Sequence, residues 1–208
     1  MISPAVNNYI HEVELNFGAI TPAREEILNS IIEYISSKRS GEKVKLTFIC
    51  THNSRRSHIS QIWAQVAAYY YGIENILTYS GGTEATSFNP RAVKAMQKAG
   101  LKITIAEESV NPVYLVEYSE NASPITSFSK TYNDEFNPQS GYCAIMTCSD
   151  ADEACPIVFG CEKRVALTYE DPKKYDDTPL EEEKYDERCF QIATEVFYLF
   201  SRLKVNTP

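Results

Sequence analysis

Long apolar runs are missing from this sequence, and so is any excess of positive charge. No stretch approaches the ~20 uninterrupted apolar residues that a membrane-spanning helix needs, so no such helix is predicted. The 208 residues carry 20 Lys and Arg against 28 Asp and Glu, which gives a formal net charge of −8. Because proteins that bind nucleic acid or anionic membranes non-specifically usually carry a basic excess, we expect neither partner.

An export signal is also missing from the first twenty residues, which have no basic segment followed by an apolar run. We therefore expect a cytoplasmic protein. Six cysteines are present nevertheless: Cys50, Cys143, Cys148, Cys155, Cys161 and Cys189. Because the cytosol is reducing, important thiols there are more often catalytic, redox-active or metal-bound than paired in structural disulfides.

Segments typical of buried strands alternate with segments of helical periodicity. Strands are predicted at residues 44–50, 76–80, 113–118, 142–147 and 165–169. Helices are predicted to begin after Thr21, at Ser57, after Asn89 and after Thr178. This alternation predicts an α/β fold with a doubly wound parallel sheet and helices on both faces. Residues 1–20 show no period, and the polar segment 119–140 is predicted to be a long surface loop.

The segment from Cys50 to Ser57 lies between a predicted strand and a predicted helix, at the sheet edge where such folds bind ligands. A thiol that attacks an oxyanion must be a thiolate, and a helix N-terminus with a nearby arginine favours that form. The loop amides can form an anion nest, and Arg56 can bind two oxygens at once. Ser57 can hydrogen-bond the sulfur, and Asn53 can hold the loop. The predicted oxyanion-binding residues are Thr51, His52, Asn53, Ser54, Arg55, Arg56 and Ser57.

The pattern Cys50-x5-Arg56-Ser57 resembles the phosphate-binding loop of low-molecular-weight protein tyrosine phosphatases and of the arsenate reductases built on the same fold. Residues 79–83 and 89–92 are similar to the second conserved block of that superfamily. The resemblance implies a four-stranded parallel sheet with Cys50 as the nucleophile. It also divides the chain into an N-terminal helical extension, residues 1–43, and a phosphatase-like or arsenate-reductase-like domain, residues 44–208.

Cys148 and Cys155 form a second group of functional candidates. Six residues separate them and no histidine follows His58, a pattern that does not favour zinc, so no metal site is predicted. Two inert buried thiols are one alternative. The other is a resolving pair, because Cys148 follows a predicted strand at the same sheet edge as Cys50. A thiolate there can attack an intermediate on Cys50, and Cys155 can then attack the resulting disulfide.

The segment 148–156 is similar to the paired-cysteine segment of thioredoxin-coupled arsenate reductases, which phosphatases of this fold lack. Those phosphatases usually carry an extra thiol immediately before the loop arginine, and that position is Arg55 here. Gln61 falls where some arsenate reductases have a glutamate that contributes to a potassium site, so no potassium is predicted. Asp171, in the sequence Glu-Asp-Pro, resembles the general acid of both families, although an ordinary Asx turn before proline is the alternative.

Arsenate reduction is the function predicted first, with Cys50, Arg56, Asp171, Cys148 and Cys155 as catalytic residues. The resemblance implies no cofactor, and it implies thioredoxin or a similar dithiol as the reductant. The alternative is a phosphatase that hydrolyses phosphotyrosine or small phosphoesters through a phosphocysteine at Cys50, with Asp171 as general acid. A third hypothesis is a redox-responsive interaction module in which residues 1–43 dock a partner.

The remaining histidine and cysteine candidates receive simpler predictions. His52 and His58 are expected to face solvent. Cys143 and Cys161 are close enough in sequence to the resolving pair to compete in disulfide exchange, and Cys189 is expected to face the core.

Overall fold

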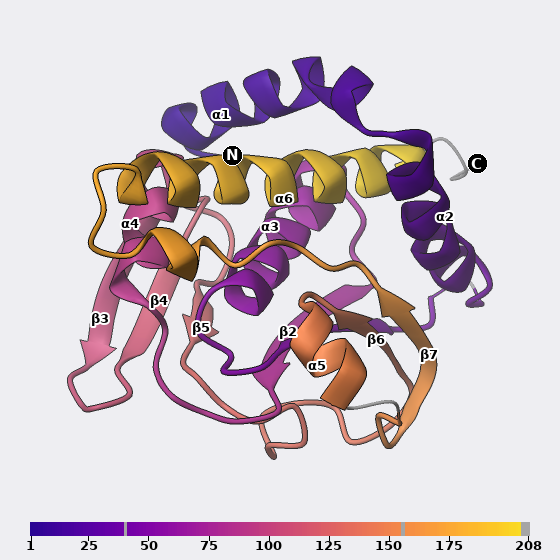
Figure 1. Cartoon of the computed structure of the whole chain (residues 1–208). Helices are drawn as coiled ribbons and strands as arrows, with labels where there is room; N and C mark the ends of the chain where they lie inside the picture. The colour runs from indigo at the N-terminus through magenta and orange to yellow at the C-terminus, as the bar shows by residue number, and fades with distance from the viewer. Residues whose placement is uncertain (40, 155–156, 205–208) are drawn as a thin grey trace.

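A four-stranded parallel sheet lies at the centre of the computed structural model, which describes residues 1–39, 41–154 and 157–204 (Figure 1). Its strands are β1 (Val44–Cys50), β2 (Ile76–Gly82), β6 (Tyr142–Met146) and β7 (Cys161–Ala166), in the order β2-β1-β6-β7. All three pairings are parallel, as the sequence predicts. The last strand lies earlier than the predicted residues 165–169.

Apolar side chains project from both faces of this sheet and form two separate clusters. Along β1, Phe48 points into the larger cluster, which is covered by α2 (Pro22–Ser36), α3 (Arg56–Tyr70) and α6 (Glu181–Lys204). The next residue, Ile49, points into the smaller cluster beneath α5 (Ser149–Ala154). Helices therefore cover both faces, as a parallel sheet requires.

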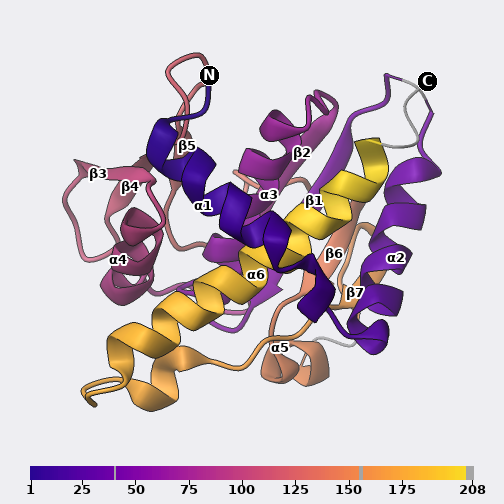
Figure 2. The same ribbon diagram turned by 90° about the horizontal axis from the view of Figure 1, so that it is seen from above.

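The N-terminal residues contribute directly to the larger cluster. Helix α1 (Pro4–Leu15) starts at a Ser3 cap and buries Val6, Ile10 and Val13 completely. It lies over α6, as two perpendicular views show (Figures 1 and 2), and a short helix, η1 (Phe17–Ala19), leads from it to α2. The sequence analysis assigned no element to residues 1–20, because three buried positions give too short a hydrophobic period to recognise.

A second, antiparallel sheet lies beside the first and was not predicted. It consists of β3 (Lys102–Glu107), β4 (Val113–Glu117) and β5 (Ile125–Ser127) in that order. The strand predicted at 113–118 exists but belongs here rather than to the parallel sheet. Helix α4 (Pro90–Lys98) precedes β3 and begins at the predicted cap, where Asn89 Oδ1 accepts a hydrogen bond from the Arg91 amide at 2.9 Å.

The segment 119–140 is not simply a surface loop, so that prediction was wrong. It contains β5, and five of its polar residues are buried: Ser119, Ser127, Ser129, Lys130 and Asn137. Their polar groups mostly bind other parts of the chain, so composition alone did not reveal their burial.

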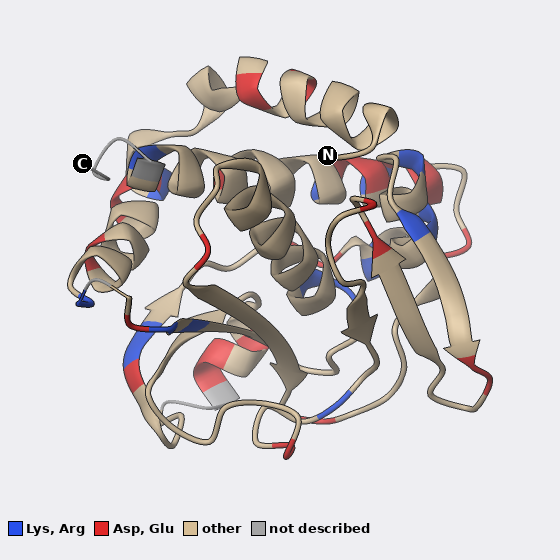
Figure 3. Cartoon of the chain, turned by 180° about the vertical axis from the view of Figure 1, so that it is seen from behind, with Lys and Arg blue, Asp and Glu red and all other residues tan. Residues whose placement is uncertain are grey.

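Charged side chains are distributed without a basic face in the view of Figure 3, where red and blue segments are interspersed. Several form ion pairs between α4 and the start of α6, among them Lys94 with Glu182 at 2.8 Å. Within the described ranges, no helix has the length and apolar character needed to cross a bilayer.

Candidate active site

The loop between Cys50 and α3 turns its carbonyl groups toward neighbouring segments. Main-chain amides of residues 83, 84 and 89 donate to the carbonyls of Cys50, Thr51 and Ser54 at 2.8 to 3.1 Å. In contrast, no residue that the structure describes accepts a hydrogen bond from the N–H groups of residues 51–55. A run of main-chain donors without internal acceptors, leading into a helix, can bind an oxyanion.

Two side chains of this loop make the contacts that the sequence analysis expects of them. Ser57 Oγ lies 3.0 Å from Cys50 Sγ, and the Asn53 side-chain amide donates to the same Ser57 Oγ at 2.9 Å. Asn53 is fully buried and has a left-handed φ of 44°, which asparagine tolerates better than most residues. The chain therefore fixes the loop conformation through Asn53 and places a hydroxyl donor beside the sulfur through Ser57.

Arg56, the first residue of α3, joins the loop to the predicted general acid. Its Nη2 donates to Asp171 Oδ2 at 2.6 Å, and its Nη1 donates to the Tyr169 carbonyl at 2.9 Å. Asp171 also caps the short helix η2 (Pro172–Tyr175), since its Oδ1 accepts from the Lys173 amide at 3.0 Å. Asp171 thus forms the Asx turn considered above. It also faces the loop of residues 50–57, here called the anion loop.

The preceding arginine, Arg55, lies farther from Asp171, with Nε 3.9 Å from Oδ1, and makes its closer contacts elsewhere. Its Nε donates to the Tyr185 hydroxyl at 2.8 Å, and its Nη2 lies 3.5 Å from Asp176 Oδ2. Of the two loop arginines, Arg56 is therefore the one that the structure pairs with Asp171 at hydrogen-bond distance. Arg55 connects the loop to α6.

Cys148 lies at the same sheet edge as Cys50. The residue is fully buried, its Sγ is 3.5 Å from Thr51 Oγ1, and it accepts from the Ala151 amide at 3.4 Å. Both thiols belong to the smaller apolar cluster. The residues that follow form the short helix α5. Cys155 lies outside the described residues.

Comparisons with known proteins agree with this arrangement. The family described as low molecular weight phosphotyrosine protein phosphatase matches residues 45–116. An arsenate reductase of Bacillus licheniformis is 34% identical over 144 residues, which cover 69% of this chain and 83% of that protein. The chain belongs to this phosphatase family. An arsenate reductase of Bacillus subtilis is 32% identical over 138 residues, covering 66% of this chain and 79% of the relative.

Solved structures extend the likeness to the fold of the phosphatase family. The low molecular weight protein tyrosine phosphatase from T. tengcongensis superposes with a TM-score of 0.51 at 15% identity, covering 77% of this chain and all of that one (100%). A YwlE mutant from Bacillus subtilis gives 0.54 at 15% identity, covering 78% of this chain and 99% of the other. Together with the named relatives, these matches identify the chain as an enzyme of this family.

Three other thiols have pKa values that burial raises. Burial raises the pKa of Cys143 to about 12 and that of Cys189 to about 11. Cys189 accepts a hydrogen bond from the Trp63 indole at 3.3 Å, so it faces the core as predicted. Burial also raises the pKa of Cys161. Because the thiolate is the reactive form, competition by Cys143 in disulfide exchange is not supported.

His52 in the loop and His58 on α3 differ in their exposure to solvent. The His52 side chain is 43% exposed and lies 3.7 Å from Glu84, as a solvent-facing residue can. His58 is fully buried and stacks on Phe88 with ring centroids 4.1 Å apart, so the prediction that it faces solvent was wrong. Burial lowers the pKa of His58, which keeps the ring neutral inside the core.

Residues 128–132 hold the anion loop from outside, and the sequence analysis missed them. Ser129 Oγ donates to the His52 carbonyl at 2.9 Å, and the Lys130 amide donates to Asn53 Oδ1 at 2.9 Å. The Lys130 ammonium lies 4.3 Å from the Phe128 ring centroid, and burial lowers the pKa of Lys130 to about 8. Both clamping contacts join residues 77 positions apart in the chain, so no local pattern could have indicated them.

Gly82 is required where β2 meets the anion loop. A Cβ there would lie 2.2 Å from the Glu84 carbonyl oxygen and 2.6 Å from that of Thr51. We therefore expect Gly82→Ala to lower the free energy of unfolding by about 1–3 kcal/mol, because main-chain atoms must shift. It should also weaken the binding of inorganic phosphate, since those atoms shape the loop. Urea unfolding and calorimetric titration measure the two effects.

Gly18→Ala provides the matched control. A Cβ at Gly18 has no neighbour within 4 Å, so both quantities should stay near wild type. Equal behaviour of the two variants would contradict the close approach at Gly82.

Proposed function

We propose that this enzyme reduces arsenate, with Cys50 as nucleophile and Cys148 as the first resolving thiol. The observation that supports this most directly is the position of Cys148, whose Sγ is 3.5 Å from Thr51 Oγ1 in the anion loop. Hydrolysis of a phosphoester needs no second thiol at this place, whereas reduction of an oxyanion needs a source of two electrons.

In the first step, the Cys50 thiolate attacks arsenic, and a hydroxyl group of the arsenate leaves as water after accepting a proton from the protonated carboxyl of Asp171. The loop amides and Arg56 stabilise the negative charge on the remaining oxygens. Arg56 is bound to Asp171 at 2.6 Å, so an incoming oxyanion competes for the guanidinium. Such competition frees the carboxyl group for proton transfer at the moment it is needed.

In the second step, the Cys148 thiolate attacks Cys50 Sγ and breaks the sulfur–arsenic bond. The bonding electron pair goes to arsenic, which leaves as arsenite, and the two sulfurs become a disulfide. Cys155 then attacks Cys148 and releases Cys50. The new Cys148–Cys155 disulfide is reduced by thioredoxin or a similar dithiol. The part assigned to Cys155 follows from the sequence resemblance alone.

The test is Cys148→Ser, assayed with arsenate and with an aryl phosphate. Steady-state release of arsenite should stop, because the thiol that the proposal assigns to breaking the bond between Cys50 and arsenic is removed. Aryl phosphate hydrolysis should persist, because water can resolve a phosphocysteine. Cys161→Ser is the control and should retain both activities. Undiminished arsenite production by Cys148→Ser would overturn the proposal, and mass spectrometry would identify any disulfide formed.

Phosphoester hydrolysis is the second candidate function, and the contact between Arg56 and Asp171 favours it. An anion site next to a carboxyl group is sufficient to cleave a phosphate monoester through a phosphocysteine at Cys50. Efficient aryl phosphate hydrolysis without any arsenite production by the wild type would select this function.

A further inference from the structure

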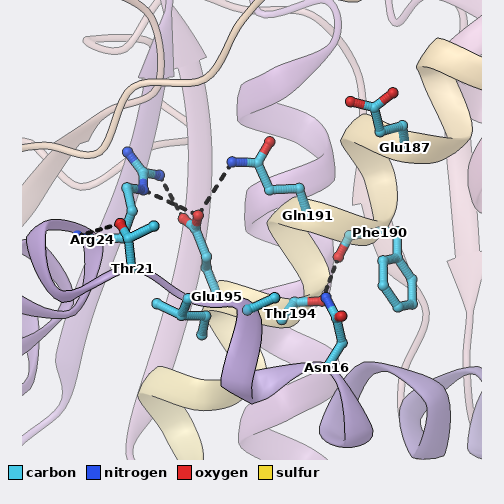
Figure 4. Close-up of a pocket in the computed structure, with 10 residues that line it drawn as sticks. Asn16, Thr21, Arg24, Glu187, Phe190, Gln191, Thr194 and Glu195 are labelled. Atoms are coloured by element: carbon cyan, nitrogen blue, oxygen red, sulfur yellow. Dashed lines mark hydrogen bonds and ion pairs between the residues drawn. The ribbon is translucent and has the colours of Figure 1, made fainter.

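The N-terminal segment and helix α6 line a pocket of about 310 Å³ that lies outside the anion site. Its lining comes from residues 16–24 and 187–195, so the N-terminal segment forms one wall (Figure 4). Arg24 and Glu195 meet there in a bidentate ion pair, with Nε to Oε1 at 3.0 Å and Nη2 to Oε2 at 2.5 Å. Glu195 is only 3% exposed, and Gln191 donates to the same carboxylate at 3.3 Å.

The third nitrogen of the Arg24 guanidinium binds the chain that leads to the active site. Nη1 donates to the Thr168 carbonyl at 3.0 Å, and the guanidinium carbon lies 4.9 Å from the centroid of the Tyr169 ring. Tyr169 is buried, and its amide donates to the Thr147 carbonyl at 3.1 Å. Residues 168–169 are therefore held by α2 from one side and by the residue before Cys148 from the other.

Tyr169 and Asp171 in turn bind the active-site arginine, Arg56. The Tyr169 carbonyl accepts from Arg56 Nη1 at 2.9 Å, and Asp171, two residues later, accepts from Arg56 Nη2 at 2.6 Å. A continuous set of contacts thus joins Glu195 to Arg24, Arg24 to residues 168–169, and these to Arg56. No step in it requires a side chain of the anion loop other than Arg56.

We propose that Arg24 is a positioning residue for Arg56 and Asp171, so that the N-terminal segment helps to shape the anion site. The inference rests on the proposed function only in taking that loop as the site of the substrate anion. The planar fork of arginine suits this position, because its three nitrogens bind Glu195 and Thr168 in fixed directions. A lysine has one ammonium group and cannot satisfy both partners with the same geometry.

The test measures binding of inorganic phosphate and hydrolysis of an aryl phosphate by Arg24→Ala. We expect phosphate affinity and kcat to fall by about tenfold or more, since a displaced guanidinium at position 56 no longer meets the anion correctly. Free guanidinium should restore part of both, because Arg24 lines the cavity and its removal leaves an adjoining space of matching shape. Loss of stability alone would not be reversed in this way.

The matched control is Arg202→Ala. Arg202 also stacks on a tyrosine, with its guanidinium carbon 5.5 Å from the Tyr198 ring centroid. It lies near the C-terminal end of α6. Its removal should leave phosphate affinity within about twofold of wild type, in the range expected of a surface substitution. Added guanidinium should have no restoring effect on it.

Wild-type phosphate affinity in a folded Arg24→Ala, or absence of guanidinium rescue, would overturn the inference. If Arg24→Ala does not fold, Arg24→Lys decides, because it keeps the charge and should still bind phosphate more weakly. A wild type that binds no phosphate would refute the proposed function instead. The NMR signals of the Arg56 guanidinium would then decide the role of Arg24, since they should be ordered in wild type and averaged in Arg24→Ala.

Discussion

Cys50→Ser should lower arsenate reduction and aryl phosphate hydrolysis by about 10⁴-fold or more, as removal of a covalent nucleophile does in other enzymes. A serine hydroxyl at this position would have the Ser57 hydroxyl 3.0 Å away, and a neutral hydroxyl is too weak a base to activate it. Initial rates with both substrates measure the effect.

Binding of phosphate distinguishes this loss of chemistry from loss of the site. Cys50→Ser should still bind phosphate within a few-fold of wild type, because the loop amides and Arg56 are unchanged. Cys161→Ser, a change to a thiol on β7, should keep full activity. Substantial turnover by Cys50→Ser would rule out covalent catalysis at this sulfur.

Arg56→Lys should reduce kcat by about 10²- to 10³-fold, the range seen when a donor to a transition-state oxyanion is removed. Lysine keeps the charge but loses the two-pronged geometry that reaches both Asp171 and the Tyr169 carbonyl. The fall should appear mainly in kcat, since charge develops on the equatorial oxygens as the nucleophile attacks. Steady-state kinetics with an aryl phosphate provide the measurement.

Arg55→Lys is the natural comparison for Arg56→Lys. Arg55 is adjacent in sequence, but its closer contacts are with Tyr185 and Asp176, and its Nε is 3.9 Å from Asp171 Oδ1. Its replacement should therefore change kcat far less. Equal losses in the two variants would mean that the loop as a whole, rather than the Arg56 guanidinium, supplies the stabilisation.

The parallel sheet and the anion loop could be predicted because their determinants are local. The apolar run of β1, the cysteine at its end and the start of α3 all lie within residues 44–56, and the sheet edge follows from strand direction. Cys148 could be placed at the same sheet edge in the same way, since it lies two residues after the end of β6. Arg56 could be singled out by its spacing from Cys50, whereas the partners of Arg55, Tyr185 and Asp176, could not be predicted because they approach it only in the folded chain.

The second sheet could not be predicted because its first strand carries little hydrophobic pattern. Only Ile103 in β3 is buried, and the strand is defined by pairing with β4 rather than by its own composition. His58 was misjudged for a related reason. Its burial depends on Phe88, which is thirty residues away and approaches only in the folded chain.

The contacts of residues 128–132 also bear on the association of this protein with other copies of itself through the edge of the sheet. β2 is an edge strand, and its last residue, Gly82, pairs with Thr131 in an isolated parallel bridge. The Gly82 amide and carbonyl bind Lys130 and Tyr132, both at 2.9 Å. These outward groups are thus already paired at the end of the strand nearest the nucleophile. Because open edges recruit strands from other molecules, this segment protects the reactive end of the sheet against intermolecular strand addition and aggregation.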